Sequence, residues 1–423
     1  MIPFDSLLIF YLAIYAASSA ADVGIEKINT IYLKKHAEDV PLGFKGLIDQ
    51  EELIKIKQYT IDKTRFNMIH ACISKMFFLF IILSGLLPWL ARSLSDVNFV
   101  GAGLIFFAVP GLLAAAIDLP FDYYRSFVIE ERHGFNTSTL KTWFSDLAKS
   151  LMLTAVIGSF LLASLLLMIQ YAGHVWWIWA CSVFIGFQLL MTVIHPTLIA
   201  PLFNKFTPIE DHALTARIKE LTGREGLSIQ GIYQMDAARR SRHTNAYFSG
   251  LGKQKRIVLF DTLIQSHNTS EIVAVLAHEI GHLKRNHIKK NLAITGMASI
   301  AFFYLASKMI TWETMFHNFG FSDMPVYVGL FLVGVLWEPF GFCLSPLVKT
   351  VSRKFEHEAD LYCIRLLKTA DPLIKALRKM AKENLANLQP HPLYVWFNYS
   401  HPPLLQRIKG LESATVATDV FDA

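Results

Sequence analysis

Residues His278-Glu279-Ile280-Gly281-His282 spell His-Glu-x-x-His and are the most informative stretch of this chain. On a helix, positions 278 and 282 lie one turn apart on the same face, so the two imidazoles can hold one Zn²⁺ together. Glu279 between them can take a proton from water activated by the metal. Apolar residues at helix-compatible spacing precede the motif and indicate a buried or half-buried helix. Because polar groups are costly there unless something binds them, the motif favours a metal site over two hydrogen-bonded core histidines.

The composition of the chain is typical of a membrane protein. Of its 423 residues, 53% are hydrophobic and only 17% are charged, which excludes an ordinary soluble enzyme. The four cysteines show no paired spacing, so we expect neither a disulfide framework nor a cysteine-based zinc site. The net charge of +6 is modest, and we attribute it to membrane topology and expect no nucleic-acid partner.

Seven apolar stretches are long enough, or nearly so, to span a bilayer. They cover residues 6–21, 73–91, 99–118, 150–171, 176–200, 291–310 and 325–347. No basic segment precedes the first stretch, so we expect a permanent span there and not a cleaved signal peptide. The sequence therefore predicts an α-helical polytopic membrane protein with seven transmembrane helices.

The distribution of lysine and arginine predicts which side of the membrane each loop faces. If the N-terminus lies outside, the cytoplasmic segments are 22–72, 119–149, 201–290 and the C-terminal tail. These segments contain nearly all basic residues, whereas the outward loops have only Arg92 and Lys308 at their edges. This asymmetry is the one that the positive-inside rule requires. It places the His-Glu-x-x-His helix on the cytoplasmic side.

These spans divide the chain into four parts. Residues 1–200 contain spans one to five with their cytoplasmic loops, and residues 201–290 form a soluble catalytic insert with the His-Glu-x-x-His helix. Residues 291–348 contain spans six and seven, and residues 349–423 complete the catalytic domain with the third metal ligand.

Local patterns predict the elements of the two soluble parts. Thr207 and Glu210 fit a capping box with Pro208 at the first helical position, which predicts a helix over 208–222. Strands are predicted at 231–235 and 256–260, with a strand and turn between them at 246–252, and further helices at 352–368 and 372–386.

A catalytic zinc needs a third protein ligand and one open position. The best candidate lies in the stretch Phe-Glu-His-Glu-Ala-Asp at 355–360. Glu356 and Asp360 share a helix face, so one can bind the metal while the other accepts a hydrogen bond from a ligating histidine. Glu358 points to nearly the opposite side, and the helical period places His287 on the wrong face of the motif helix. Taken alone, the stretch also fits an ordinary charged helix.

Three further stretches could support such a site. Two prolines after His401 fix its direction, and with Arg407 it could stabilise an oxyanion or grip a carboxylate, although a proline-stopped surface loop is the alternative. The backbone from Asn245 to Tyr247 could offer an edge strand to an extended peptide, although the basic residues before it also fit a solvated turn. The loop around His133 is expected to pack against the catalytic domain.

With these residues assembled, the chain resembles the integral-membrane CAAX prenyl protease 1 family, seven-span zinc endopeptidases typified by the yeast a-factor-processing protease. The matching stretches are 119–122, 127–136, 199–208, 245–248, 255–263, the motif helix, 355–360 and 400–403. The resemblance implies a barrel of seven helices that encloses a water-filled chamber. A mainly helical, zincin-type catalytic domain with a small β-sheet would cover its cytoplasmic end.

The resemblance also implies the role of each site residue. The ligands of one Zn²⁺ per chain would be His278, His282 and Glu356. Glu279 would be the catalytic base, Asp360 an assisting acid, and His401 and Arg407 would approach the scissile carbonyl. The residues that line the substrate strand would be Asn245 and Ala246.

The implied activity is cleavage of peptide bonds near the C-terminus of CAAX-type, prenylated or other peptides by a monomer in the bilayer. One alternative is a protease that clears misfolded or translocation-stalled membrane proteins. Another is a non-enzymatic transport or receptor protein with a structural zinc, which the lack of a fourth ligand and the few ionisable residues in the spans oppose. The length and the absence of a C-terminal retention string are typical of a bacterial member in the inner membrane; a eukaryotic member would lie in the endoplasmic reticulum.

Overall fold

The computed structural model describes residues 5–36, 39–249 and 255–421. Within these residues, seven helical segments are long and apolar enough to cross a membrane, which confirms the seven predicted spans. They are α1 (Ser6–His36), α2 (Gln50–Leu83), α4 (Phe99–Tyr124) with the π-helical η2 (Arg125–Glu130), α5 (Leu140–Tyr171), α6 (Trp176–Ile194) with the π-helical η4 (His195–Ile199) and α7 (Ala200–Phe203), α11 (His287–Met309), and α13 (Val326–Leu367). Short helices connect several of them, namely η1 (Leu42–Phe44), α3 (Leu86–Ser93), η3 (Gly173–Val175) and α12 (Glu313–Asn318).

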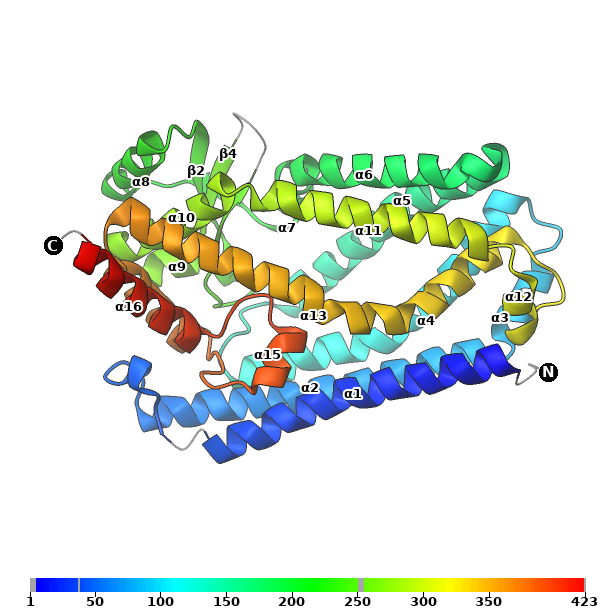
Figure 1. Cartoon of the computed structure of the whole chain (residues 1–423), viewed down its shortest axis with the longest axis horizontal. Coiled ribbons are helices and arrows are strands. Elements are labelled where there is room, and N and C mark those ends of the chain that lie inside the picture. Colours follow the sequence, from blue (N-terminus) through cyan, green and yellow to red (C-terminus); the bar gives the residue numbers. More distant parts are fainter. Residues whose placement is uncertain (1–4, 37–38, 250–254, 422–423) are drawn as a thin grey trace.

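Several spans continue well beyond the hydrocarbon core of a bilayer. Helix α2 has 34 residues and α13 has 42, whereas about 20 residues suffice to cross the membrane. The predicted span 325–347 and the predicted soluble helix 352–368 are therefore parts of one helix, α13. In Figure 1 this helix runs from the end of the molecule that holds α12 to the end that holds the sheet.

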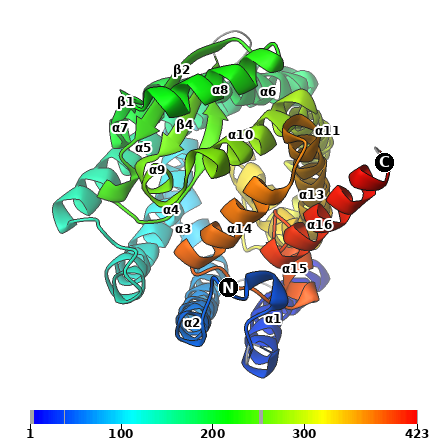
Figure 2. The ribbon, with the colours of Figure 1, turned by 90° about the vertical axis from the view of Figure 1, so that its left-hand side faces the viewer.

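The spans leave much of their surface uncovered by protein. In the end-on view of Figure 2, α1 and α2 lie on the side opposite α6, as they do in Figure 1. Only 6% of the most apolar stretch of α5 is buried by protein, and only 11% of the most apolar stretch in the segment that contains α6 is buried. The side chain of Asp118, paired with His70 at 2.8 Å, is 54% exposed. Because a charged group in contact with lipid is costly, we expect the face of α4 that holds Asp118 to look on to water, as the predicted chamber would require.

The predicted catalytic domain contains a four-stranded sheet with the order β1-β2-β4-β3 among the described residues. Its strands are β1 (Phe206–Pro208), β2 (Ile229–Met235), β3 (Ala246–Ser249) and β4 (Lys255–Phe260). Strand β2 pairs in parallel with β4, while β1 and β3 add to them antiparallel, so β3 is an edge strand. The domain's helices are α8 (His212–Arg224), η5 (Ala237–Arg239), α9 (Asp261–Ser266), α10 (Thr269–Lys284), α14 (Asp371–Glu383), α15 (Pro392–Asn398) and α16 (Leu404–Phe421).

The sequence predictions for this domain are mostly confirmed. The strands predicted at 231–235 and 256–260 are β2 and β4, and the helix predicted at 372–386 is α14. The strand predicted at 246–252 is β3 as far as Ser249, and residues 250–252 lie outside the described part of the chain.

The predicted start of the helix at 208–222 is wrong. Thr207 and Pro208 belong to β1, where Thr207 pairs with Gln234 of β2. The helix α8 begins at His212, and Asp211 caps it by accepting from the Leu214 backbone N–H at 2.9 Å. A proline is tolerated in an edge strand, so a signal for a helix start also fits a short strand that finds a partner in the fold.

One hydrophobic core holds the catalytic domain together around α10. Leu276, Ala277 and Ile280 on this helix are fully buried, and they pack with residues of α8, β4, α13 and α14. The loop around His133 joins this domain to the spans, as predicted. The Arg242 N–H donates to the Phe135 carbonyl at 3.1 Å, and Asn136 forms an antiparallel bridge with Ser241.

Candidate metal centre

Helix α10 places the two motif histidines beside α13. Asn268 and Glu271 form a capping box that fixes where the helix begins. At position 281 the two helices almost touch, because a methyl group there would lie 2.9 Å from the Ala359 Cα and 3.0 Å from its carbonyl oxygen. Only glycine allows this approach, which brings the motif within reach of the carboxylates on α13.

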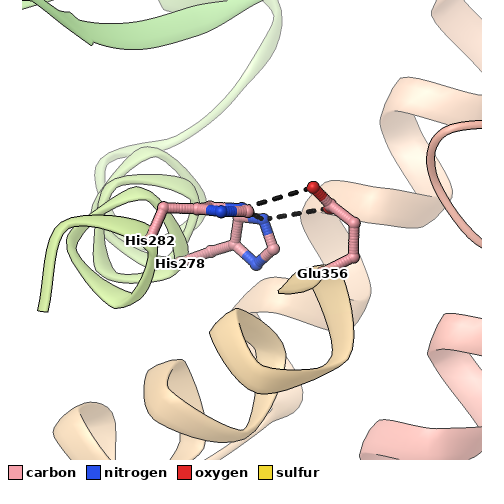
Figure 3. Close-up of side chains that lie close together, drawn as sticks. All are labelled: His278, His282 and Glu356. Carbon is pink, nitrogen blue, oxygen red and sulfur yellow. Dashed lines mark hydrogen bonds and ion pairs between the residues drawn. The ribbon is translucent and has the colours of Figure 1, made fainter. Parts of the chain in front are cut away.

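The side chains of His278, His282 and Glu356 converge, as Figure 3 shows. One ligand atom from each lies within 4.8 Å of the others. The Glu356 carboxylate reaches the Nε2 atoms of both histidines, at 3.4 Å for His278 and 3.3 Å for His282. The two predicted ligands on α10 and the predicted ligand on α13 are therefore brought together.

The chemistry of this cluster fits a metal ion. The two Nε2 atoms face each other at 3.1 Å, and the buried Glu356 carboxylate lies 3.4 Å from the Nε2 of His278 and 3.3 Å from the Nε2 of His282. Burial and Arg407 lower the pKa of His278, but hydrogen bonds to Asp360 and Glu356 outweigh them and raise it to about 9. The site thus attracts positive charge. Two imidazoles and one carboxylate with room for a further ligand are the donor set of a catalytic zinc.

Asp360 and Arg407 lie on the Nδ1 side of the His278 ring, away from the metal position. The Asp360 Oδ1 lies 2.8 Å from the Nδ1 of His278, so the carboxylate can accept the N–H of the imidazole nitrogen that does not face the metal position. Arg407 donates to both oxygens of Asp360, with its Nε at 2.9 Å and its Nη2 at 2.6 Å. Its remaining nitrogen, Nη1, lies 3.8 Å from the Glu356 Oε2. The predicted supporting contact of Asp360 is present.

His401 lies on the exposed side of the same cluster. Its Nε2 is 3.2 Å from the Glu356 Oε1, and its side chain is 63% exposed. The segment that holds it is fixed by Arg353, which sequence reasoning missed. The guanidinium of Arg353 donates to the carbonyls of Val395 at 3.1 Å and Tyr399 at 2.7 Å.

The motif glutamate has a carboxylate that is free to act. Glu279 is half-buried and makes no hydrogen bond within the described part of the chain. Burial is the largest influence on the pKa of Glu279 and raises it above the ordinary value, against the two motif histidines. A raised pKa makes a carboxylate a stronger base near neutral pH.

The predicted substrate strand lies next to the motif helix. Ala246 begins the edge strand β3, which contacts α10, and it pairs with Leu259 of β4. The Asn245 carbonyl accepts from the Phe260 N–H at 3.1 Å, and its side chain accepts from the Ala246 N–H at 2.8 Å. These bonds hold the start of β3 in an extended form.

The argument that placed His287 on the wrong face is wrong, because it assumed an unbroken helix. Helix α10 ends at Lys284, and Asn286 adopts a left-handed conformation with φ of 57° before α11 begins at His287. His287 does not belong to the group of three possible ligands among the described residues. Its Nδ1 lies 2.9 Å from the Nδ1 of His282, a contact that the helical period could not predict.

Comparison with known proteins places this site in a family. The model of the "CAAX prenyl protease N-terminal, five membrane helices" family matches residues 29–205, and that of "Peptidase family M48" matches residues 208–415. The CAAX prenyl protease 1 homolog of Arabidopsis thaliana is 35% identical over 390 residues, covering 90% of this chain and 92% of that protein. The CAAX prenyl protease 1 of Saccharomyces cerevisiae is 33% identical over 410 residues, covering 90% of each. The crystal structure of S. mikatae Ste24p superposes with a TM-score of 0.88 at 31% identity, over 95% of this chain and 99% of that one.

The chain belongs to the CAAX prenyl protease 1 family.

Membership in the CAAX prenyl protease 1 family makes this chain a membrane-embedded metalloprotease of the M48 type. It confirms the expected fold class, seven spans with a mainly helical catalytic domain and a small sheet. It also rules out the alternative of a non-enzymatic protein with a structural zinc. The family implies a metal at the cluster of His278, His282 and Glu356.

Proposed function

We propose that this protein binds one zinc ion through His278, His282 and Glu356 and hydrolyses peptide bonds near the C-terminus of CAAX-type, prenylated substrates. The observation that carries the proposal is the convergence of these three ligand atoms within 4.8 Å, together with a Glu279 carboxylate that feels their charges and has no hydrogen bond to any described residue. The curated relatives named CAAX prenyl protease 1 support the substrate class.

When bound, zinc would lower the pKa of a water molecule and polarise the scissile carbonyl. Glu279 is not one of the three possible ligands, but its carboxylate is near enough for the charges of His278, His282 and Glu356 to act on it. It accepts a proton from the attacking water and delivers that proton to the leaving amine. Its raised pKa suits both steps, since the group must hold the proton briefly and then release it.

His401 and Arg407 act on the substrate carbonyl from the side of Glu356. The exposed His401 ring can donate a hydrogen bond to the carbonyl oxygen as negative charge develops there. Arg407 uses Nε and Nη2 to hold Asp360, and its Nη1 is the part of the guanidinium left to face the substrate. Asp360 assists by holding the His278 ring in one tautomer.

The edge strand β3 holds the substrate in an extended form. An edge strand presents unpaired main-chain groups, and a peptide can add to them as a further strand. Asn245 and Ala246 lie at the start of β3, where this strand contacts α10. Main-chain pairing there would place the scissile bond beside α10, whatever most side chains of the substrate are.

We further propose that the protein acts as a monomer. We also propose that its N-terminus lies outside and its catalytic domain on the cytoplasmic side. The support for this orientation is the concentration of lysine and arginine in the segments that it places inside. In a bacterium that membrane is the inner one. The parts 1–200, 201–290, 291–348 and 349–423 would then alternate between bilayer and cytoplasm.

The test compares the purified wild-type protein with Glu279→Gln and with Glu383→Gln, a surface control at the exposed end of α14. Zinc content is measured by elemental analysis, and cleavage is followed with matched prenylated and unprenylated CAAX peptides. We expect about one zinc in all three proteins and a loss of turnover of about 10²-fold or more in Glu279→Gln alone. Turnover by Glu279→Gln at the wild-type rate would contradict the assignment of the base.

The two peptides separate the substrate classes. Preference for the prenylated peptide supports a CAAX protease, whereas equal cleavage of both favours the alternative role in clearing misfolded or stalled membrane proteins.

A further inference from the structure

His282 is linked to a carboxylate through a second histidine. Its Nδ1 lies 2.9 Å from the Nδ1 of His287, and the Nε2 of His287 lies 3.1 Å from the Glu358 Oε2. These three side chains come from α10, α11 and α13. We call these three side chains, His282, His287 and Glu358, the row. His287 at its centre is 2% exposed and therefore shielded from water.

The carboxylate at one end decides where every proton in the row lies. An ionised carboxylate only accepts hydrogen bonds, so the Nε2 of His287 must carry the proton that it donates to Glu358. A neutral imidazole with a proton on Nε2 has a lone pair on Nδ1, which can only accept. The Nδ1 of His282 must therefore carry a proton and donate it. The Nε2 of His282 is then left with a free lone pair, directed at Glu356 and His278.

The surrounding packing holds the row in this geometry. The His287 ring stacks on Phe355 with ring centroids 4.3 Å apart and planes at 9°. Lys290 lies 3.4 Å from the Glu358 Oε2 and 5.2 Å from the centre of the Phe355 ring. An adjacent ammonium group favours the ionised form of the carboxylate, which is the form that only accepts. The left-handed residue before α11 turns the chain so that His287 can reach back to the motif.

We propose that His287, anchored by Glu358, is a positioning residue of the metal centre. It keeps the His282 ring in the tautomer and orientation that present Nε2 to the metal. The inference rests on the metal site proposed above, but it assigns a role to two residues that are not ligands. His278 receives the same support directly from Asp360, whereas Glu358 points away from the cluster and reaches His282 only through the intervening ring.

The test measures zinc affinity by competition with a chelator in the full-length protein. The variants are His287→Phe, which retains a ring to stack on Phe355, His287→Asn, which retains an acceptor near the Nδ1 position, and Glu358→Gln, which retains the shape of the side chain. The matched control is His357→Phe, because His357 lies beside a ligand on α13 but is exposed. Loss of a residue that orients a ligating histidine typically lowers metal affinity by about 10–100-fold.

We expect a loss of this size in His287→Phe, a smaller one in His287→Asn, and a decrease in Glu358→Gln, with His357→Phe unchanged. The Co²⁺-loaded proteins provide a readout that a merely structural role would not move. Their visible absorption reports the ligand field, and it should shift in His287→Phe and return towards that of the wild type in His287→Asn.

Wild-type zinc affinity and Co²⁺ spectra in both His287→Phe and Glu358→Gln would overturn the proposal while leaving the proposed function intact. If His287→Phe does not fold, Glu358→Gln decides alone, since Glu358 is outside the hydrophobic core. A wild-type protein that binds no zinc would overturn the proposed function, and this role of His287 with it.

Discussion

Replacement of Gly281 by alanine should damage the metal centre without changing any ligand. Gly281 lies at the crossing of α10 and α13, where an added methyl group would be 2.9 Å from the Ala359 Cα, 3.0 Å from the Ala359 carbonyl oxygen and 3.0 Å from the Tyr362 Cβ. Two of these atoms belong to the backbone, so no rotation of a side chain can relieve the contact.

The size of the effect follows from these distances. Carbon atoms in contact prefer about 3.5–4.0 Å, so the helices must separate by about 0.6–1 Å along this direction. Metal–ligand distances tolerate about 0.2 Å, which is several times less. An overpacked core costs about 1–3 kcal/mol. Alanine also gains about 1 kcal/mol over glycine in a helix, so the net loss of stability should be about 2 kcal/mol or less.

The assay pairs zinc affinity with thermal unfolding of the zinc-free protein for Gly281→Ala and for the control Gly410→Ala. Gly410 lies within α16, and no atom of the described residues is within 4 Å of an added methyl group, so alanine there should leave zinc binding unchanged and stabilise slightly. We expect zinc affinity to fall by about tenfold or more in Gly281→Ala. Zinc affinity and turnover equal to the wild type would refute the reasoning that the close crossing sets the distance between the ligands.

Three further results are expected. The pKa of His278 is about 9 without metal, so below that pH the ion must displace a proton from this side chain. Zinc affinity, measured by competition with a chelator, should therefore rise about tenfold per pH unit between about pH 7 and about pH 8.5. An affinity that does not change with pH would contradict this. Asp360→Asn removes the negative charge that faces the His278 Nδ1 and the Arg407 guanidinium, and should lower zinc affinity by about 10–100-fold, measured by chelator competition. Arg240→Lys loses the two hydrogen bonds to Asp146, at 2.7 and 3.0 Å, that connect residues 201–290 to α5. The free energy of unfolding should fall by about 1 kcal/mol, which lowers the midpoint of thermal unfolding. An unchanged midpoint would show that this contact does not stabilise the protein.

The ligands could be predicted from the sequence because their geometry is local. His278 and His282 lie one turn apart on the same helix, and so do Glu356 and Asp360, so the helical period alone decides which side chains share a face. That Asp360 could accept a hydrogen bond from a ligating histidine followed once the two helices were assumed to meet, and the structure identifies that histidine as His278. That they do meet depends on Gly281, whose role was invisible until Ala359 was placed beside it.

His287 is outside the group of possible ligands, as expected, but the reason given for it was wrong because it extended a local rule across a break. The helical period holds only while the chain stays helical, and the left-handed residue Asn286 ends that stretch. A similar limit applies to Thr207 and Pro208, which carry a signal for the start of a helix yet pair with β2. In both places a contact with a distant segment decided the outcome, and no spacing along the chain encodes such a contact.

Composition and periodicity by themselves determined that this is a membrane protein with seven apolar helices and that His278 and His282 share one face of a helix, because burial in lipid and helical repeat act on neighbouring residues. Only the tertiary structure decided how closely α10 approaches α13 and that β3 lies at the edge of the sheet beside α10. It also decided that His287 contacts His282 and that Glu358 contacts His287. These features join residues far apart in the sequence, such as Gly281 with Ala359 and His287 with Glu358, and packing in three dimensions is what sets their distances.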